Sequence, residues 1–287
     1  MTRSGITGID HLLIPVRDLE TARMVWTRLG FTTSPRGTHL GRGTGNYCIM
    51  FEHDYLELFG VLDPTLASAS YVNFLAEREG PMKLAWATRD AHVAAEALAG
   101  LGLHPSEVKD LQRQIELPEE TAVPRFAIVS LPAEETPGLD SFLCAHLTPK
   151  LMRRPPWLQH PNGAVGIAGI TVAVADTESL IPRYEYLFGP GNLHTTDDVL
   201  TVRAGRHRII FATHDDVAVL HPEIDPLPGD PCPAIAVVTL AVADLDRTGD
   251  HLTQWQIEHE VVGRRSIVVP ASAAMGTNIE FIPASRA

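Results

Sequence analysis

Two ionisable side chains interrupt apolar stretches of this 287-residue chain at positions where they could meet a cation. His11 follows Asp10 inside the run GIDHLLIPV, and Glu57 lies inside the run YLELFG. An unpaired carboxylate that faces a core is costly, so Glu57 either faces water or meets a cation. In a strand its side chain shares a face with Tyr55 and Phe59, which favours an interior partner. His11 taken alone has a simpler explanation, a core histidine bonded to a neighbour.

A glycine-punctuated segment between these two residues, GTHLGRGTGN, carries His39, Thr44 and Asn46. Their side chains could line a binding site and bond substrate oxygens, and a polar hairpin explains them equally well. The glycines do not form a phosphate-binding loop, because no Lys-Ser/Thr pair follows them to open a helix. The chain also lacks the GxSxG elbow of serine hydrolases and a GxGxxG turn for dinucleotides.

Composition restricts the function further. The formal net charge of -12 repels phosphate backbones, so we expect no nucleic-acid partner. The cysteines Cys48, Cys144 and Cys232 are widely spaced, which argues against a zinc ribbon or a disulfide framework and fits a reducing compartment. The N-terminus has no apolar signal region, and no apolar run approaches the roughly 20 residues that span a bilayer. We therefore expect a soluble, cytoplasmic protein without a membrane partner.

One pattern occurs four times along the chain: an apolar strand, an Asp and then a helix. The four segments read GIDHLLIPVRDLETARMVWTRLGF, MKLAWATRDAHVAAEALAGLGL, GITVAVADTESLIPRYEYLFG and VVTLAVADLDRTGDHLTQWQI. The acids at the helix N-cap positions are Asp18, Asp90, Asp176 and Asp244. Shorter strand-like runs follow each helix, for example Tyr47–Phe51 and Tyr55–Gly60. The repeating unit is therefore β-α-β-β with a further strand, which predicts an α+β protein.

A proline-rich connection separates the second repeat from the third. Residues 148–163 read TPKLMRRPPWLQHPNG, and the adjacent Pro155 and Pro156 prevent regular structure throughout this stretch. We place a domain boundary here, with a first domain over residues 1–155 and a second over residues 156–287.

These features together resemble the vicinal-oxygen-chelate superfamily, and its glyoxalase-like subgroup most closely. The superfamily includes glyoxalase I, bleomycin-resistance proteins, methylmalonyl-CoA epimerase and extradiol ring-cleavage dioxygenases. The resemblance rests on GIDHLLIPVRDLE, GTHLGRGTGN and YLELFG, and is strongest over residues 5–63. It implies an α+β fold of four βαβββ modules paired into two cup-shaped mixed-sheet domains, with a metal site in the first.

The resemblance also implies a set of metal ligands, since these come from the first and last strands of each module. His11 and Glu57 occupy these positions in the first module, and the last strand of the second, SFLCAHLTP, offers His146. Two imidazoles and one carboxylate suit one divalent ion, without distinguishing Fe, Zn, Mn, Ni and Co. The remaining position, counted back from Asp90, holds Lys83, which binds no metal when protonated. Lys83 is expected to hold an anionic substrate group, to act as a base, or to lie at the surface.

The residues expected to contact substrate are His39, Thr44, Asn46, Lys83 and His160. His160 and Asn162 belong to an HPNG element that resembles one in the subgroup, and this element either covers the site or turns the chain. No residue is assigned a catalytic role. In the second half the first-strand positions fall on Gly169 and Val237, and Glu280 is the one acid at a ligand-like position. We therefore expect the second half to be structural or to cover the substrate.

Three functions follow from the resemblance. The first is a metal-dependent lyase or isomerase that acts on a small carbonyl substrate with adjacent oxygens. The second is an extradiol-type ring-cleavage dioxygenase that uses Fe(II), although those enzymes keep their site in the C-terminal half. The third is a non-enzymatic small-molecule binding protein, as in bleomycin resistance. The expected partner is a small-molecule substrate, and a homodimer is an open option.

Overall fold

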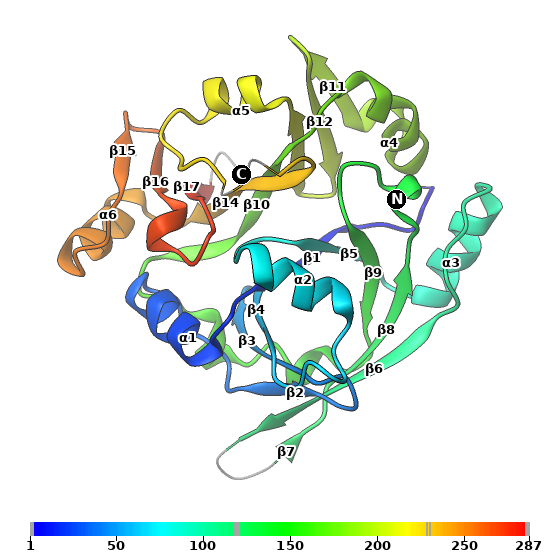
Figure 1. Cartoon of the computed structure of the whole chain (residues 1–287), viewed down its shortest axis with the longest axis horizontal. Helices are drawn as coiled ribbons and strands as arrows, with labels where there is room; N and C mark the ends of the chain where they lie inside the picture. Colours follow the sequence, from blue (N-terminus) through cyan, green and yellow to red (C-terminus); the bar gives the residue numbers. More distant parts are fainter. Residues whose placement is uncertain (1–2, 118–120, 228, 230, 285–287) are drawn as a thin grey trace.

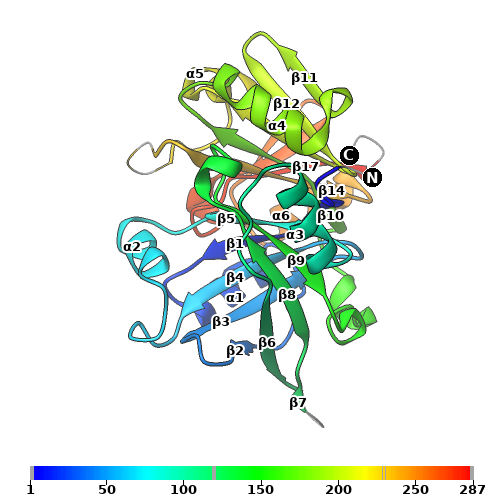
Figure 2. The same cartoon turned by 90° about the vertical axis from the view of Figure 1, so that its right-hand side faces the viewer.

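The computed structural model describes residues 3–117, 121–227, 229 and 231–284. It has the predicted α+β architecture, built on two mixed β-sheets (Figure 1). The sheet of the first half has nine strands and that of the second half has eight. In Figure 2 the second half lies above the first.

The first half contains two modules joined by a helix. The first module comprises β1 (Gly8–Pro15), α1 (Leu19–Arg28), β2 (Gly37–His39), β3 (Thr44–Met50) and β4 (Tyr55–Val61), and α2 (Ala69–Glu77) follows it. The second comprises β5 (Lys83–Ala87), α3 (Ala91–Gly100), β6 (Lys109–Glu116), β7 (Thr121–Ala122), β8 (Arg125–Ser130) and β9 (Ser141–His146). The predicted N-caps are confirmed, because the side chains of Asp18 and Asp90 accept hydrogen bonds from backbone N–H groups of the first helical turns.

The second half repeats this plan. The third module comprises β10 (Ala164–Ala173), α4 (Ile181–Phe188), β11 (Leu193–Thr196), β12 (Val199–Ala204) and β13 (His207–Ala212), and α5 (His214–Leu220) follows it. The fourth comprises β14 (Ala234–Val242), α6 (Leu245–Gln254), β15 (Glu260–Val262), β16 (Ser266–Val269) and β17 (Ile279–Pro283). Asp244 caps α6 as predicted. Asp176 instead accepts from the N–H of Glu178 at the start of a 3-10 turn, and α4 begins only at Ile181, with a proline in its first turn.

The first sheet closes on itself. Its order is β2-β3-β4-β1-β5-β9-β8-β6-β7, and β2 also pairs with β6, with His39 opposite Arg113. A β-carbon on Gly37 of β2 would lie 2.4 Å from Asn46 Oδ1 and 2.7 Å from Arg113 Cδ, so this closing strand requires a glycine there. Closure turns the inner side chains of alternating residues toward one enclosed volume. The first half is therefore a cup, as predicted.

The second sheet has the order β11-β12-β13-β10-β14-β17-β16-β15. As in the first sheet, the first strands of the two modules pair antiparallel at the centre, here β10 with β14. Each of these strands also pairs parallel with the last strand of its own module. The two sheets are thus versions of one plan.

The helix that follows the first module of each half behaves differently in the two halves. Val217 of α5 is buried and packs against a cluster that includes Ala212, Ala236 and Val237, inside the second cup. Within α2, by contrast, no side chain is buried. In the second half the connecting helix therefore packs on its sheet through a buried side chain, whereas α2 buries none.

The two halves share one hydrophobic core, because the main cluster of buried apolar residues includes members of both sheets. Trp86 of β5 packs on Phe188 of α4 with ring centroids 5.3 Å apart. Polar contacts also cross the seam: His207 Nε2 lies 3.1 Å from Asp54 Oδ2, and His207 Nδ1 accepts from the N–H of Ile9. The predicted boundary near residue 155 lies between the end of β9 and the start of β10, and the division into two domains stays a prediction.

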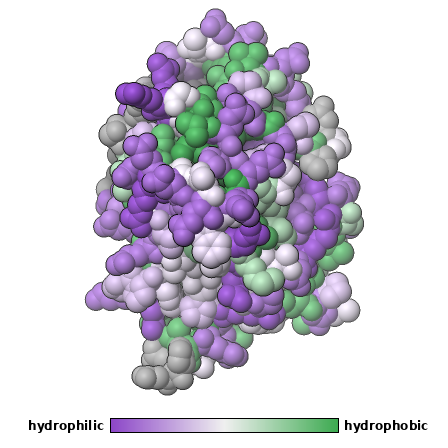
Figure 3. All heavy atoms as spheres, turned by 90° about the vertical axis from the view of Figure 1, so that its left-hand side faces the viewer, coloured by the Kyte–Doolittle hydropathy of each residue, from purple (hydrophilic) through white to green (hydrophobic). Residues whose placement is uncertain are grey.

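Hydrophilic side chains dominate the face seen in Figure 3, and apolar residues appear there in separate small groups. This agrees with the formal net charge of -12. No helix within the described residues combines the length and the apolar character needed to cross a bilayer.

Candidate active site in the first cup

The first cup encloses a cavity of about 540 Å³. Strands β1 to β6, β8 and β9 contribute to its wall, and the segment from Leu66 to Tyr71, at the start of α2, covers it. Its lining combines aromatic and aliphatic side chains with a few polar ones, among them His11, His39 and Glu57. Such a mixture is typical of a small-molecule site, in which polar groups orient a largely apolar ligand.

His11 and Glu57, the two residues that the resemblance implies as ligands, lie next to each other at this cavity. The parallel pairing of β1 with β4 sets Leu13 opposite Glu57, and His11 Nε2 lies 3.4 Å from Glu57 Oε2. Both residues are 4 % exposed. Burial raises the pKa of Glu57, but a hydrogen bond with His39 and the nearby His11 and Arg113 more than reverse this and lower it to about 2. Glu57 is therefore an ionised carboxylate at neutral pH.

Asp10 fixes the orientation of the His11 ring. The register between β1 and β5 shifts between Ile9 and His11. Every residue of β1 is buried, including the consecutive Asp10 and His11. His11 Nδ1 lies 2.7 Å from Asp10 Oδ2. Burial raises the pKa of Asp10, but contacts with His146 and His11 reverse this and hold it well below its ordinary value. The ionised Asp10 accepts a hydrogen bond from Nδ1–H of His11, and Nε2 on the other side of the ring faces Glu57.

The three polar residues of the glycine-rich segment lie beside Glu57, where they were predicted to line the site. His39 Nδ1 is 2.9 Å from Thr44 Oγ1, and His39 Nε2 is 3.5 Å from Glu57 Oε1. Asn46 donates from Nδ2 to Glu57 Oε1, and its Oδ1 is buried without a hydrogen-bond partner. The carboxylate of Glu57 thus has a separate imidazole next to each of its oxygens.

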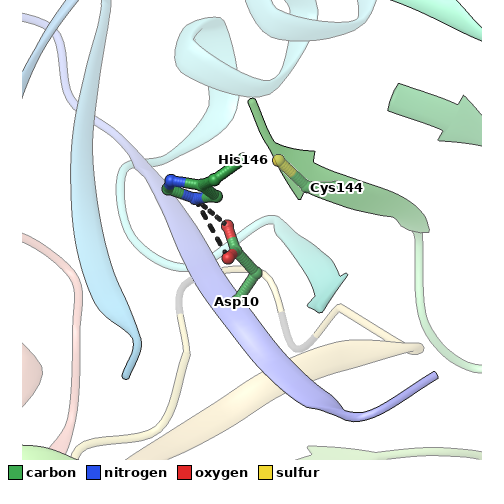
Figure 4. A group of neighbouring side chains, drawn as sticks. All are labelled: Asp10, Cys144 and His146. Atoms are coloured by element: carbon green, nitrogen blue, oxygen red, sulfur yellow. Dashed lines mark hydrogen bonds and ion pairs between the residues drawn. The ribbon is translucent and has the colours of Figure 1, made fainter. Parts of the chain in front are cut away.

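His146 lies behind this pair rather than beside it. Its Nε2 is 3.1 Å from each oxygen of Asp10 (Figure 4). The pairing of β5 with β9 sets Ala85 opposite Phe142. When the two modules are aligned at their helix caps, Asp18 with Asp90, Leu13 of β1 corresponds to Ala85 of β5. Phe142, the partner of Ala85, therefore corresponds to Glu57, the partner of Leu13. His146 is therefore joined to His11 through the carboxylate of Asp10.

A second set of donor atoms lies around Asp10. Single ligand atoms of Asp10, Cys144 and His146 all lie within 4.8 Å of one another, which makes this a group that could hold a metal ion (Figure 4). Burial, and then the charge of Asp10, raises the pKa of the Cys144 thiol well above its ordinary value. In this structure Cys144 is therefore a neutral thiol.

The other two predicted contact residues have different surroundings. Lys83 lines the cavity, where its Nζ is 2.8 Å from Asp140 Oδ2 and 5.4 Å from the centre of the Tyr71 ring. His160 lies away from the cavity lining. Its Nδ1 accepts from the N–H of Thr32 and its Nε2 donates to the carbonyl of Met50, so it ties the chain together.

Several residues of this site escape sequence reasoning. Arg113 of β6 lines the cavity at 2 % exposure, and Tyr55 stacks on His11 with ring centroids 4.4 Å apart. Tyr71 contributes from α2, a helix that the repeat pattern does not contain. Of these three residues, only Tyr55 carried a sequence signal, because strand alternation puts it on the same face as Glu57.

The second cup contains fewer groups of this kind. Glu280 Oε2 accepts from Thr239 Oγ1 and lies 4.0 Å from His221 Nδ1. Among the described residues, the donor group around Asp10 is the one cluster of potential metal ligands, and it belongs to the first half. A β-carbon on Gly169 would lie 2.1 Å from the carbonyl oxygen of Arg208, so β10 has no space for a histidine at the place of His11.

The donors around Glu57 fit a divalent ion in chemical type. Two ligand atoms that share a metal at about 2.0–2.1 Å lie roughly 3.0–3.4 Å apart. His11 Nε2 lies 3.4 Å from Glu57 Oε2 and His39 Nε2 lies 3.5 Å from Glu57 Oε1, so each pair taken separately is close to this range. Among the described residues, these three side chains do not gather as closely as the group around Asp10. Asp10, bonded to Nδ1 of His11, has the place of the carboxylate that orients metal-bound histidines.

Residues 9–188 match the sequence pattern of a family described as glyoxalase-like domain. A hypothetical protein from Staphylococcus aureus has a similar structure, with a TM-score of 0.66 and 11 % identity, over 96 % of this chain and 98 % of that one. A triple mutant of 4-hydroxymandelate synthase from Streptomyces coelicolor superposes with a TM-score of 0.58 and 15 % identity, over 97 % of this chain and 93 % of that one.

A fusion protein of a xylose isomerase-like TIM barrel and 4-hydroxyphenylpyruvate dioxygenase is similar over 98 % of this chain and 50 % of its own length, with a TM-score of 0.50 and 13 % identity. No curated protein matches the chain in sequence. At these identities the structural matches show the fold alone.

Proposed function

The chain belongs to the family of glyoxalase-like domain proteins, and from this premise we propose that its first cup is the active site of a metal-dependent enzyme. The proposed substrate is a small carbonyl compound with adjacent oxygens, and the reaction is that of a lyase or isomerase. The observation that carries the proposal is the Asp10–His11–Glu57 arrangement at the cavity wall.

His11 and Glu57 are the proposed ligands. Asp10 keeps Nδ1 of His11 protonated, so that Nε2 is free to donate its lone pair, and the ionised Glu57 supplies negative charge. A bound divalent ion would act as a Lewis acid on a carbonyl or enolate oxygen. The apolar wall keeps water away from this centre, which strengthens each electrostatic interaction within it.

The third ligand is either His146, the residue that the family resemblance implies, or His39. His146 would have to leave Asp10 to reach the His11–Glu57 pair, since its Nε2 contacts both oxygens of that carboxylate. His39 is already 3.5 Å from Glu57, and its Nδ1 is bonded to Thr44. The contacts therefore favour His39 as the ligand, with His146 as a supporting residue behind Asp10.

A dioxygenase is the second candidate function. Two imidazoles and one carboxylate are the donor set of non-haem Fe(II) oxygenases. The position of the donors in the first half of the chain counts against an extradiol enzyme. Consumption of oxygen by the Fe(II)-loaded protein with a catechol would favour this candidate over the lyase.

The remaining expectations concern partners and location. Cys48 and Cys144 are buried thiols outside any disulfide, which supports our proposal that the protein works in the reducing cytoplasm. A homodimer stays a prediction, to be checked by the solution mass.

Elemental analysis of the purified and reconstituted protein tests the proposal. We expect about one ion per chain, and we expect His11→Ala and Glu57→Ala to lose it while they keep the wild-type fold. Asp10→Asn should retain the site but bind the ion roughly 10–100-fold more weakly, as for other partners of metal-bound histidines. The exposed His92, changed to Ala, is the matched control.

The third ligand is identified by the same measurement. Loss of the ion in His39→Ala, with retention in His146→Ala, assigns His39, and the reverse result assigns His146. A wild-type protein that takes up no stoichiometric ion from Fe, Zn, Mn, Ni or Co would overturn the enzymatic proposal and leave a binding protein.

A further inference from the structure

Arg113 is a buried cation at the wall of the cavity, and the reaction proposed above does not use it. It projects from β6, opposite His39 of β2, and it is one of the largest fully buried side chains of the chain. Its Nη1 donates to Cys48 Sγ at 2.8 Å and its Nη2 donates to Met152 Sδ at 2.6 Å. Its Nε is buried and has no hydrogen-bond partner.

These partners satisfy a guanidinium poorly. A thiol and a thioether are weak acceptors, whereas a carboxylate accepts two parallel N–H bonds from arginine. Burial raises the pKa of Cys48 to about 12, so its sulfur is a neutral thiol. Over the part of the chain that the structure describes, no ion pair joins Arg113 to a carboxylate. Burial lowers the pKa of Arg113, but its neighbours, the ionised Glu57 among them, more than reverse this and raise it. Glu57 acts on Arg113 through space and makes no direct ion pair with the guanidinium. Within the described chain the N–H groups of Arg113 therefore have only weak sulfur acceptors, and Nε has none, so this position suits an anion supplied from outside.

We propose that Arg113 binds the carboxylate group of the substrate, so that the enzyme acts on small organic acids. The incoming carboxylate takes the edge formed by Nε and Nη2, in place of the thioether of Met152. The inference rests on the proposed function only in that the same cavity receives the substrate.

The other charges of the cavity favour a single negative charge on the ligand. Glu57 is ionised in the same cavity and repels anions, most strongly those that carry two charges. Of the two other Lys and Arg side chains that line the cavity, Lys83 is already paired with Asp140, and Arg42 is exposed to solvent. A monocarboxylate therefore suits the cavity better than a phosphate ester.

Calorimetric titration of the full-length protein tests this inference, with and without bound metal. The probes are 2-hydroxybutyrate, its neutral amide and inorganic phosphate. We expect the wild-type protein to bind the carboxylate about tenfold or more tightly than the amide, in line with hydrogen bonds to charged groups, and to bind phosphate less tightly than the carboxylate. Arg113→Met should remove the preference for the carboxylate, and the surface variant Arg203→Met should keep it.

The variant Arg113→Lys is the control for a folding defect. It retains the positive charge and should keep part of the preference for the carboxylate over the amide. The ratio of carboxylate to amide binding would not change if Arg113 only supported the fold. Equal binding of acid and amide by the wild-type protein would overturn the inference, as would an unchanged ratio in Arg113→Met. In Glu57→Gln the preference should persist, so a protein that loses its metal but still selects the acid separates this inference from the metal proposal.

Discussion

The two cups of this protein are built from the same module, yet they differ in what they enclose. In both, the first strands of two modules pair antiparallel, and a helix follows the fourth strand of the leading module. In the first half that helix, α2, buries no side chain of its own and lies over a cavity of about 540 Å³. In the second half α5 packs the buried Val217 against Ala212, Ala236 and Val237 of the sheet.

The comparison shows that the sheets place equivalent glutamates in the two halves. The helix after the fourth strand of each half then influences whether that glutamate borders a cavity. Leu13 pairs with Glu57 in the first half, and Thr239 pairs with Glu280 in the second. The two glutamates therefore have corresponding places. Only Glu57 has imidazole nitrogen atoms near both of its oxygens, and only Glu57 borders a cavity wall. A duplicated module can thus keep its architecture while one copy becomes purely structural.

The strongest test of this comparison replaces each of the two glutamates, Glu57 and Glu280, with glutamine in a separate variant. Glu57→Gln should lose the metal, with a fall in affinity beyond the roughly 10–100-fold that loss of an outer partner causes. Glu280→Gln should leave the metal content unchanged. Among the described residues, the potential metal ligand next to Glu280 is His221, whose Nδ1 lies 4.0 Å from Glu280 Oε2. Metal titration with elemental analysis measures both. Equal losses in the two variants would show that the cups share one function.

A smaller effect is expected from the two connecting helices. Val217→Ala removes two buried methyl groups from the second cup and should lower the free energy of unfolding by about 2 kcal/mol. Val72→Ala in α2 should change it by less than about 1 kcal/mol, since that helix buries no side chain and alanine favours helix formation. Chemical denaturation of both variants gives the two values. A larger loss in Val72→Ala would mean that α2 is packed as firmly as α5.

The smallest effect concerns the seam between the cups, where burial lowers the pKa of His160 from 6.5 to about 4. A histidine whose pKa is lower in the folded than in the unfolded protein stabilises the folded state fully at pH values above its unfolded pKa. For His160 this contribution disappears as the pH falls from 6.5 toward 4. At pH 5.5 the loss amounts to about 1.4 kcal/mol relative to pH 7.5.

Unfolding in urea at these two pH values, for the wild-type protein and for His160→Gln, isolates this contribution. The variant is expected to show a weaker dependence on pH than the wild type. Identical pH dependence in the two proteins would mean that His160 is not held neutral at the seam.

Much of the fold was predictable because its signals are local. An aspartate before each helix forms bonds within a few residues of itself, so Asp18, Asp90 and Asp244 identified three helix starts correctly. The fourth start was displaced because a proline occupies the first turn of α4. The helices α2 and α5 were not predicted, since they lie between the repeats and belong to none of them.

The sequence by itself determined the four modules, because periodicity and helix caps are local signals. The family resemblance added His11 and Glu57 as expected ligands, and it offered His39, Thr44 and Asn46 as substrate contacts beside the equal alternative of a polar hairpin. Only the tertiary structure decided that His146 contacts Asp10, that Arg113 lies buried at the same cavity and that α5 packs on the second sheet. Those arrangements depend on strand register across modules and on sheet closure, and a shift of one residue there turns a side chain to the opposite face.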